Sequence, residues 1–380
     1  MRNSIVIGLG FGDEGKGRTV DFLVANLNYE NTLTVRYSGG QQAGHTVVLN
    51  GVRHVFSNFG SGSLRGVPTY WSEFCTVDPV GIINELDILL EKGIKPKLYI
   101  NPDSPVTIPF DKYISKENRS HGTCGTGVGN TFARNESFYS ITAMDLLYRD
   151  VLEMKLKLAN EKYYKHYKYI KKDSKYDKYD ELKRIEFLNA VQRLITSEHI
   201  EIVTNIHRSE RFSNIIFESS QGLLLDQHYG FFPHVTRSNV GTTNINHFYA
   251  NDDYFDAHVY LVTRAYQTRH GNGPMTNESI SFDIIKDPNE TNKTEEFQGE
   301  FRRSMLDLDL LKYAINKDRG LRTFTNKTLV ITCLDHIAGN WAFTKQGTVY
   351  RFISEESFIN EIKSYLGIHD VIQFNNPENK

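Results

Sequence analysis

Residues 4–24 combine three features whose order constrains the fold more than any other stretch of the chain. SIVI (4–7) is a short apolar run, GLGFGDEGKG (8–17) is rich in glycine, and RTVDFLV (18–24) has the pattern of an amphipathic helix. A buried strand, a glycine loop and a helix in this order are typical of a phosphate-binding loop. The segment therefore predicts an anion site at the carboxyl end of the first strand.

Similar apolar runs recur along the chain, namely TLTVRY, KLYI, IIFESS, VYLVT and TLVITCL. Short, continuous and β-branched runs are typical of strands that are buried on both faces of a parallel sheet. A helical pattern, VGIINELDILLEKG, lies between two of them and ends at Gly93. We therefore predict an α/β fold with a largely parallel central sheet, surrounding helices and a P-loop-like phosphate loop after the first strand.

Composition and charge exclude several classes of protein. The formal net charge is −2, from 44 basic and 46 acidic residues, which does not favour nucleic acid or a membrane surface as a partner. Cys75, Cys124 and Cys333 lack CxxC spacing, so we expect no zinc site and no disulfide framework. A strand by residue 4 leaves no room for a signal peptide, and no apolar run is long enough for a membrane helix. These features favour a cytoplasmic protein.

We expect residues 1–380 to form one domain with a helical insertion at 151–199. The insertion is rich in Lys and Tyr and lacks Gly and Pro, which predicts two helices broken near Asp173 and Ser174. Our interpretation is a solvated helical segment. The alternative is contact with RNA or a partner through interleaved Lys and Tyr, although no RNA-binding motif supports it.

The glycine loop fits the pattern GxxxxGK from Gly10 to Lys16, with two departures. Gly17 stands where the common loop has a Ser or Thr that binds magnesium. A carboxylate pair, Asp13 and Glu14, lies inside the loop. Asp13 could hold Mg²⁺ through a hard oxygen, or it could take a proton from an acceptor molecule. Backbone N–H groups for the phosphates would come from the glycines of the loop, Gly10, Gly12, Gly15 and Gly17.

Three further loops carry polar groups suited to phosphorylated ligands. RYSGGQQAGHTVV (36–48) places His45 beside glycines at a strand end, where an imidazole can donate a proton or a hydrogen bond. HGTCGTGVGNTFARN (121–135) is a second Gly/Thr loop followed by an arginine. ESSQGLLLDQHYGFFPHVTRSNVGTTN (218–244) contributes Gln221 and Thr236. Each of the last two loops could also be purely structural.

These motifs together resemble the adenylosuccinate synthetase family. GFGDEGKG followed by GGQQAGHTVV is similar to the paired N-terminal signature of that family. HGTCGTGVG is similar to its IGTTGRGIG, FESSQGLLLD to its FEGAQGTLLD, and RAYQTRHGNGP to its KAYSTRVGAGP. The resemblance covers about two-thirds of the chain.

The resemblance implies a homodimeric ligase that transfers the terminal phosphoryl group of GTP to the 6-oxygen of IMP, after which aspartate displaces phosphate. Asp13 would take the proton from purine N1 and bind Mg²⁺, and His45 would act as electrophile and acid. Gly44 would bind Mg²⁺ through its carbonyl. The remaining roles implied are GTP binding by Gly12, Glu14, Gly15, Lys16, Gly17 and Asp335, and purine monophosphate binding by Gln42, Thr123, Arg134, Gln221 and Thr236. Lys16 and Gln221 would also assist catalysis, and Arg134 would be lent to the partner's site.

Four differences from the family motifs stand out. Gln42 replaces an Asn, and Cys333 replaces the Lys of TKLD, although Asp335 remains to bind guanine. The aspartate-binding loop is reduced to EFQGEFRRSMLD (296–307), in which Arg302 and Arg303 are expected to bind the amino acid. The chain is also shorter than typical bacterial members.

Two alternatives remain open from the sequence. One is the same chemistry on dGMP, dIMP or another amino acid, as in a phage branch of the family that makes 2-amino-deoxyadenylosuccinate. That branch has Ser where this chain keeps Asp13. The other is a nucleotide-binding regulator without turnover, which the retained Asp13, Lys16 and His45 disfavour.

Overall fold

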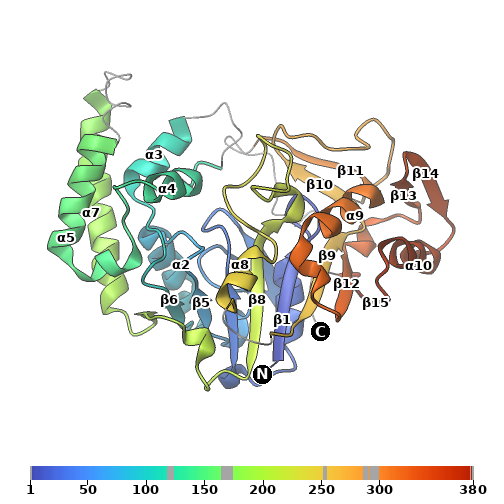
Figure 1. Ribbon diagram of the computed structural model, residues 1–380, viewed down its shortest axis with the longest axis horizontal. Helices are drawn as coiled ribbons and strands as arrows, with labels where there is room; N and C mark the ends of the chain where they lie inside the picture. Colours follow the sequence, from blue (N-terminus) through green and yellow to red (C-terminus); the bar gives the residue numbers. More distant parts are fainter. Residues whose placement is uncertain are drawn as a thin grey trace.

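A nine-stranded, all-parallel sheet is the centre of this computed structural model, which describes residues 2–117, 124–163, 174–250, 255–285, 290, 299–376 and 378. The strand order is β15-β12-β9-β1-β8-β2-β5-β6-β7 (Figure 1). The nine strands are β1 (Arg2–Gly8), β2 (Thr32–Arg36), β5 (Thr69–Trp71), β6 (Leu98–Ile100), β7 (Ile200–Ile202), β8 (Asn214–Gly222), β9 (His258–Arg264), β12 (Lys327–Thr332) and β15 (Asp370–Gln373). All six apolar runs identified in the sequence are strands of this sheet, which confirms the predicted fold class.

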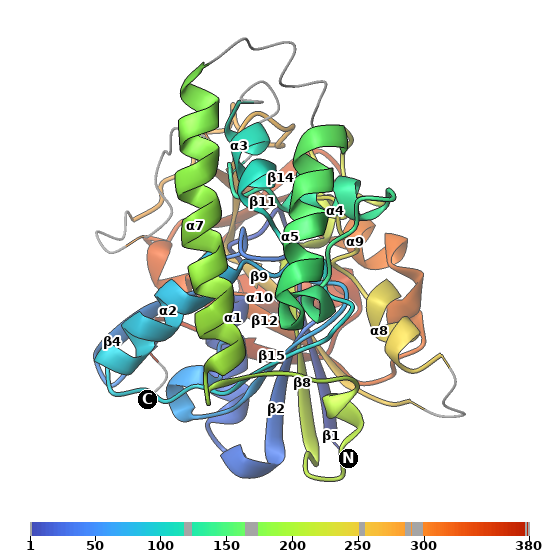
Figure 2. The same cartoon turned by 90° about the vertical axis from the view of Figure 1, so that its left-hand side faces the viewer.

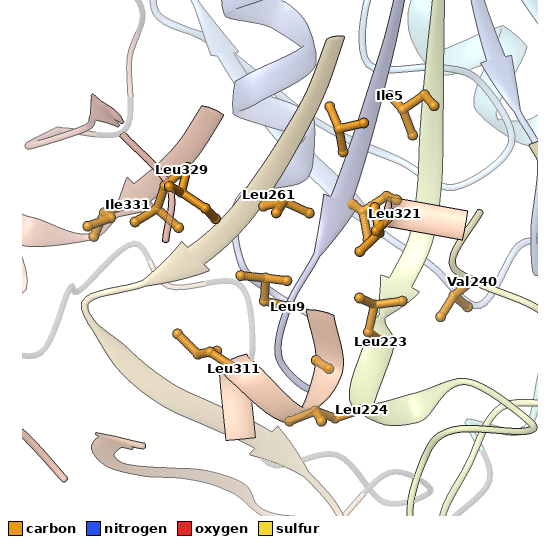
Figure 3. Close-up of a cluster of buried hydrophobic side chains, with 14 of the residues drawn as sticks. Ile5, Leu9, Leu223, Leu224, Val240, Leu261, Leu311, Leu321, Leu329 and Ile331 are labelled. Atoms are coloured by element: carbon orange, nitrogen blue, oxygen red, sulfur yellow. The ribbon is translucent and has the colours of Figure 1, made fainter. Parts of the chain in front are cut away.

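Both faces of the central strands are buried, which explains their uninterrupted apolar sequences. In β1, Ile5 and Ile7 belong to one core cluster, whereas Val6 packs on the opposite face in another. Figure 3 shows the first cluster, where Ile5, Leu261 and Leu329 from three neighbouring strands meet Leu311 and Leu321. Because successive side chains of a strand point to opposite faces of the sheet, each central strand contributes to two hydrophobic cores.

Helices surround the sheet, as expected (Figure 1). They are α1 (Lys16–Val24), α2 (Pro79–Glu91), α3 (Pro109–Glu117), α4 (Val128–Asn135), α5 (Arg149–Leu158), α7 (Ser174–Thr196), α8 (Thr243–Phe248), α9 (Leu308–Lys317) and α10 (Glu355–Leu366). The predicted glycine stop of α2 is present: Gly93 follows the cap residue Lys92 with a φ of 76°, a conformation that favours glycine.

Two smaller sheets flank the carboxyl edge. One has the order β10-β11-β13-β14 and comprises β10 (Tyr266–His270), β11 (Phe301–Asp307), β13 (Trp341–Lys345) and β14 (Thr348–Phe352). The other is a hairpin of β3 (His45–Leu49) and β4 (Val52–Phe56). Asn50 and Gly51 join β3 to β4 with φ values of 51° and 75°, as expected of a tight Asn-Gly hairpin turn.

The Lys/Tyr-rich stretch contains two long helices, α5 and α7, which lie side by side (Figure 2). The expected break near Asp173 lies outside the described residues, and α7 begins at Ser174. The expectation of a solvated segment needs correction, because α7 buries Phe187, Val191 and Leu194 in the core that it shares with α2. Within the described ranges, each helix is too short or too polar to cross a membrane.

Candidate active site

The carboxyl ends of the central strands open into one cavity of about 1120 Å³. Its walls come from the segments that follow β1, β2, β8, β9 and β12, which are neighbours in the sheet. A crevice of this kind is where open parallel sheets bind ligands. Of the residues singled out in the sequence, the cavity wall includes Asp13, Gly15, Lys16, Gly17, Gln42, Gly44, His45, Gln221, Thr236 and Asp335.

Glu14 explains why a carboxylate lies inside the glycine loop. Its side chain is buried, and Oε1 accepts hydrogen bonds from the backbone N–H groups of Gly10 at 3.0 Å and Gly12 at 2.8 Å. Oε2 lies 2.7 Å from the ammonium of Lys16. Burial alone would raise the pKa of Glu14, but the Lys16 charge and these hydrogen bonds lower it. The carboxylate of Glu14 therefore occupies, inside the loop, the kind of position that a bound anion would take.

This internal pair changes what the loop offers a ligand. The N–H groups of Gly10 and Gly12 and the ammonium of Lys16 already have a carboxylate partner. Donors for a phosphate must therefore come from farther along the loop, where Gly15, Lys16 and Gly17 line the cavity at the start of α1. Glu14 is not one of the described residues that line this cavity. Its role is therefore to hold the conformation of the loop.

Close packing explains two glycines around this loop. A Cβ at Gly222 would come within 2.1 Å of the Gly10 carbonyl oxygen and 2.2 Å of Glu14 Oε1. A Cβ at Gly17 would approach His45, Ser61 and the Thr46 carbonyl at 3.0 Å each. The β3–β4 hairpin therefore occupies the space where a phosphate loop commonly has Ser or Thr.

Asp13 lies at the cavity with its carboxylate 21 % exposed. Its φ of 62° is left-handed, and its carbonyl oxygen accepts a 2.5 Å hydrogen bond from Nε of Arg264. Oδ2 is 3.4 Å from Nε2 of His270. Burial raises the pKa of Asp13, while His270 and Arg264 oppose that rise. A carboxylate whose pKa is raised and which faces a cavity is suited to accept a proton.

His45 is the first residue of β3 and is held by a buried carboxylate. Its Nδ1 is 2.5 Å from Oε1 of Glu218, and its Nε2 is 3.1 Å from the Ser220 carbonyl oxygen. Burial and the nearby Arg36 lower the pKa of His45, and Glu218 counteracts them. The charges of His45 and Arg36 lower the pKa of Glu218 to about 2 despite its burial. Glu218 is therefore the group that orients the imidazole and favours its protonation.

The cavity wall also offers neutral polar groups. Both side-chain amide atoms of Gln42 are buried and have no hydrogen-bond partner among the described residues. Gln221 follows the β8 residue Ser220, and Thr236 lies on the loop beyond it. Unpaired buried amide atoms are costly in a folded protein unless a ligand or water satisfies them. Gln42 is therefore available to a bound molecule.

At the far end of the cavity, Asp335 follows β12 with its carboxylate 36 % exposed. Cys333 precedes it in a left-handed conformation, φ 57°. Arg18 also lines this end, and its guanidinium stacks on the ring of Phe374 at 3.9 Å. This end thus has one carboxylate beside a planar cation, a suitable pair for a nucleobase.

Two expected substrate residues are not brought to the site. The guanidinium of Arg134 is fully buried, forms an ion pair with Asp111 at 2.9 Å and donates to the carbonyls of Val106 and Tyr139. A side chain enclosed in this way cannot be lent to a partner, so we correct that assignment to a structural one. Thr123 lies outside the described residues.

Arg302 and Arg303 lie on β11 and differ in their contacts. The guanidinium of Arg302 pairs with Glu278 at 2.7 Å and donates to the Gly273 carbonyl oxygen at 2.5 Å. Arg303 lies over the ring of Phe301 at 4.9 Å and makes no ion pair within the described ranges. Neither is among the described residues of the cavity wall. Of the two, Arg303 has the cation that is available to a carboxylate ligand.

The donor set also bears on magnesium. No group of three or more His, Cys, Asp or Glu side chains in the described ranges could by itself hold a metal ion. Mg²⁺ in nucleotide enzymes is bound by one or two protein oxygens together with substrate phosphates and water. The carboxylate of Asp13 and the exposed backbone of Gly44, both at the cavity, fit that kind of site.

A model of one protein family, described as adenylosuccinate synthetase, matches residues 5–366. The chain belongs to the adenylosuccinate synthetase family. It is an enzyme of that GTP-dependent ligase family, and its role falls within purine biosynthesis.

Curated relatives agree with this assignment. Adenylosuccinate synthetase of Halothermothrix orenii is 31 % identical over 362 residues, which cover 89 % of this chain and 78 % of that protein. The Deinococcus radiodurans enzyme is 30 % identical over 354 residues, covering 89 % of this chain and 83 % of the relative.

Two solved structures share the fold at low sequence identity. Fully ligated adenylosuccinate synthetase from Plasmodium falciparum has a TM-score of 0.77 at 16 % identity and covers 99 % of this chain and 97 % of its own. Succinoaminodeoxyadenylate synthetase (PurZ) of cyanophage S-2L, bound to dGMP and dATP, has a TM-score of 0.62 at 15 % identity, with coverages of 99 % and 93 %. These likenesses support the family fold and do not distinguish the two activities.

Sequence reasoning missed several charged residues of the site, namely Arg36, Glu218, Arg264 and His270. A signal for three of them was present, because Arg36, Glu218 and Arg264 each interrupt or end an apolar strand of the family fold. A charge in a buried strand must be paired or functional. The partners of Glu218 and Arg264, however, include His45 and Asp13, which lie far away in the sequence.

Replacing Glu218 with Gln is expected to flatten the pH dependence of folding stability. Because the folded pKa of about 2 lies below the ordinary value of 4.5, ionised Glu218 stabilises the protein above that value and loses this effect as pH falls toward 2. The lost contribution is about 3 kcal/mol. Urea unfolding at a series of pH values between 6 and 3 would measure the part lost down to pH 3, about 2 kcal/mol. Identical pH profiles for the two proteins would contradict the assignment.

Proposed function

We propose that the chain joins L-aspartate to a 6-oxopurine nucleoside monophosphate, with IMP as the purine, and consumes GTP to give adenylosuccinate. The observation that carries this proposal is the presence of Asp13 and His45 on the wall of one cavity at the carboxyl edge of the sheet, with the buried Glu218 holding His45 from behind the wall. A base and an acid on the walls of one site match a reaction in which an oxopurine loses a proton while its oxygen attacks a phosphoryl group.

In the first half-reaction, Asp13 accepts the N1 proton of the purine, which makes the 6-oxygen a stronger nucleophile. That oxygen attacks the terminal phosphorus of GTP, and the bond to the bridging oxygen breaks to release GDP. His45, oriented by its contact with Glu218, is the group that would donate a hydrogen bond to the oxygen on which charge develops. Gly15, Lys16 and Gly17 bind the phosphates of GTP, while Gln42, Gln221 and Thr236 bind the purine monophosphate.

In the second half-reaction, the aspartate amine attacks C6, phosphate leaves with the 6-oxygen, and the amine loses a proton. Arg303 binds a carboxylate of the amino acid, and Arg302, the preceding residue of β11, is expected to assist after exchanging its contact with Glu278. At the far end, Asp335 accepts hydrogen bonds from N1–H and the amino group of guanine. Mg²⁺, when bound through Asp13 and the Gly44 carbonyl, neutralises negative charge on the phosphates.

A matrix of substrates tests this function. IMP, dIMP, GMP and dGMP would be combined with aspartate or other amino acids and with GTP or ATP, and the products identified by mass spectrometry. We expect adenylosuccinate from IMP, aspartate and GTP. A product only from dGMP would assign the chain to the phage type of activity instead, and no product in any combination would favour a regulator without turnover.

The variant Asp13→Asn is expected to lose at least about 10²–10⁴-fold in kcat, because an amide cannot take the N1 proton. Calorimetric binding of IMP should be nearly unchanged, since Asn keeps the shape of Asp. His228→Asn, a change outside the cavity wall, is the control. Turnover near the wild-type rate in Asp13→Asn would remove Asp13 from the mechanism.

Replacing Arg303 with Ala should raise the KM for the amino acid and lower kcat/KM by about 10- to 100-fold, because one charged hydrogen bond is lost. Positional isotope exchange in GTP, measured with IMP and without amino acid, should continue, because it reports only the first half-reaction. Arg193→Ala, on the exposed face of α7, is the control. Loss of exchange with unchanged amino-acid saturation would place Arg303 at the nucleotide instead.

We also propose that residues 1–380 act as one domain of a cytoplasmic homodimer, with the 151–199 segment as an insertion. The three cysteines are unpaired, which supports a reducing compartment. Four apolar side chains, spaced as one helical stripe, are 38–55 % exposed on α5 and the turn before it: Leu147, Val151, Met154 and Leu158. Leu182 and Ile185 of α7, the helix beside α5, are exposed as well. Such a surface is suited to a second copy of the chain.

Met154→Glu is therefore expected to shift the protein from dimer to monomer in sedimentation velocity, because a charge would be buried in the interface. Thr348→Glu adds the same charge on β14, far from α5 (Figure 1), and should leave the dimer intact. A dimer that persists in Met154→Glu would show that this stripe is not the interface.

A further inference from the structure

One buried tyrosine connects the two ends of the proposed site. Tyr266 begins β10, and only 2 % of it is exposed. Its hydroxyl oxygen is 2.9 Å from Nη1 of Arg264 and 2.8 Å from Nδ1 of His336. Arg264 and His336 lie on the cavity wall, whereas Tyr266 does not. The tyrosine therefore contacts residues of the site without reaching a substrate.

The direction of these hydrogen bonds follows from the donors. A guanidinium can only donate, so the Tyr266 oxygen accepts from Arg264 and its own hydrogen is left for His336. Burial raises the pKa of the Tyr266 phenol, so the hydroxyl keeps its hydrogen. Nδ1 of His336 is in position to accept this hydrogen bond, and in the neutral imidazole with that tautomer the ring hydrogen is on Nε2. Nε2 lies 3.8 Å from Oδ2 of Asp335, which is within ion-pair range and longer than a hydrogen bond.

The other end of the connection supports Asp13. Arg264 donates through Nε to the Asp13 carbonyl oxygen at 2.5 Å, and through Nη1 also to Glu290 at 2.9 Å. Asp13 has a left-handed φ of 62°, which is unfavourable for a residue other than glycine. Three acceptors around one guanidinium fix its plane. The resembled motif KAYSTR has a lysine at this position. The ammonium group of lysine is not planar and cannot be oriented by three acceptors in the way that the guanidinium of Arg264 is.

We propose that the Tyr266 hydroxyl is a positioning residue that joins nucleobase recognition at Asp335 to the placement of Asp13 through His336 and Arg264. The inference rests on the proposed function. Tyr266 contacts no ligand itself, but it sets the orientation of Asp13 and Asp335, which do. A guanine bound at Asp335 would thereby be connected, through His336, Tyr266 and Arg264, to the loop that carries Asp13.

The test is the variant Tyr266→Phe, which keeps the ring and removes the connection. We expect kcat/KM for GTP to fall about 10-fold, as for loss of one hydrogen bond to a charged group. With Asp335→Ala present, the same change should cost at most about 2-fold, because coupled residues are non-additive. Calorimetry should show GDP binding weakened about 5- to 10-fold and ADP binding unchanged.

Tyr260→Phe is the matched control, because Tyr260 is a buried tyrosine of β9 that packs on the face of the sheet occupied by α1. It should leave GTP selectivity unchanged. Should Tyr266→Phe fail to fold, His336→Ala breaks the same connection and should give the same loss for GTP. The proposal would be overturned if Tyr266→Phe lowered kcat/KM equally for GTP and ATP. It would also be overturned if the losses in kcat/KM from Tyr266→Phe and Asp335→Ala were additive. Equal binding of GDP and ADP by the wild-type protein would instead contradict guanine recognition in the proposed function.

Discussion

The buried carboxylate of Glu14 is the constraint on which the site depends. It gathers the N–H groups of Gly10 and Gly12 and the ammonium of Lys16 into one closed arrangement. A buried charge of this kind is tolerated only when it is paired and hydrogen-bonded. The loop is therefore rigid before any ligand arrives, and Asp13, its neighbour in the sequence, is turned toward the cavity. Gly222 of β8 leaves the space that this arrangement needs.

The same principle recurs around the cavity. Glu218 holds His45, and Arg264 holds the backbone of Asp13. Both pairs join elements that are far apart in the sequence, and each fixes a side chain or loop at the carboxyl edge of the sheet. Preorganised charges cost no reorganisation at the moment of reaction. The pairs also make the site sensitive to single substitutions, since removal of one partner leaves the other buried and unpaired.

The fold could be predicted well from the sequence, and the site only in part. Strands buried on both faces have an apolar signature of their own, so six of the nine strands of the sheet were predicted, whereas the short strands β5, β7 and β15 were not. The glycine loop and its strand placed the cavity correctly. The roles of Glu14 and Arg134 were not predictable, because their burial depends on residues such as Gly222 and Asp111 that a local pattern does not connect with them. The solvated character expected of residues 151–199 was wrong for one face of α7, because that face packs on α2, about a hundred residues earlier in the chain.

The sequence by itself determined the parallel α/β fold, the family and the loops that meet at the sheet edge, because these follow from short-range periodicity and from motifs contiguous in the chain. Only the tertiary structure decided which charged side chains face the cavity and which form buried pairs that stabilise the loops around it. Glu14 and Asp13 are adjacent carboxylates with the same local context, yet one is enclosed by glycines and Lys16 while the other faces the cavity. That difference arises from the packing of β8, β9 and the β3–β4 hairpin against the loop, and so from contacts that exist only in the folded chain.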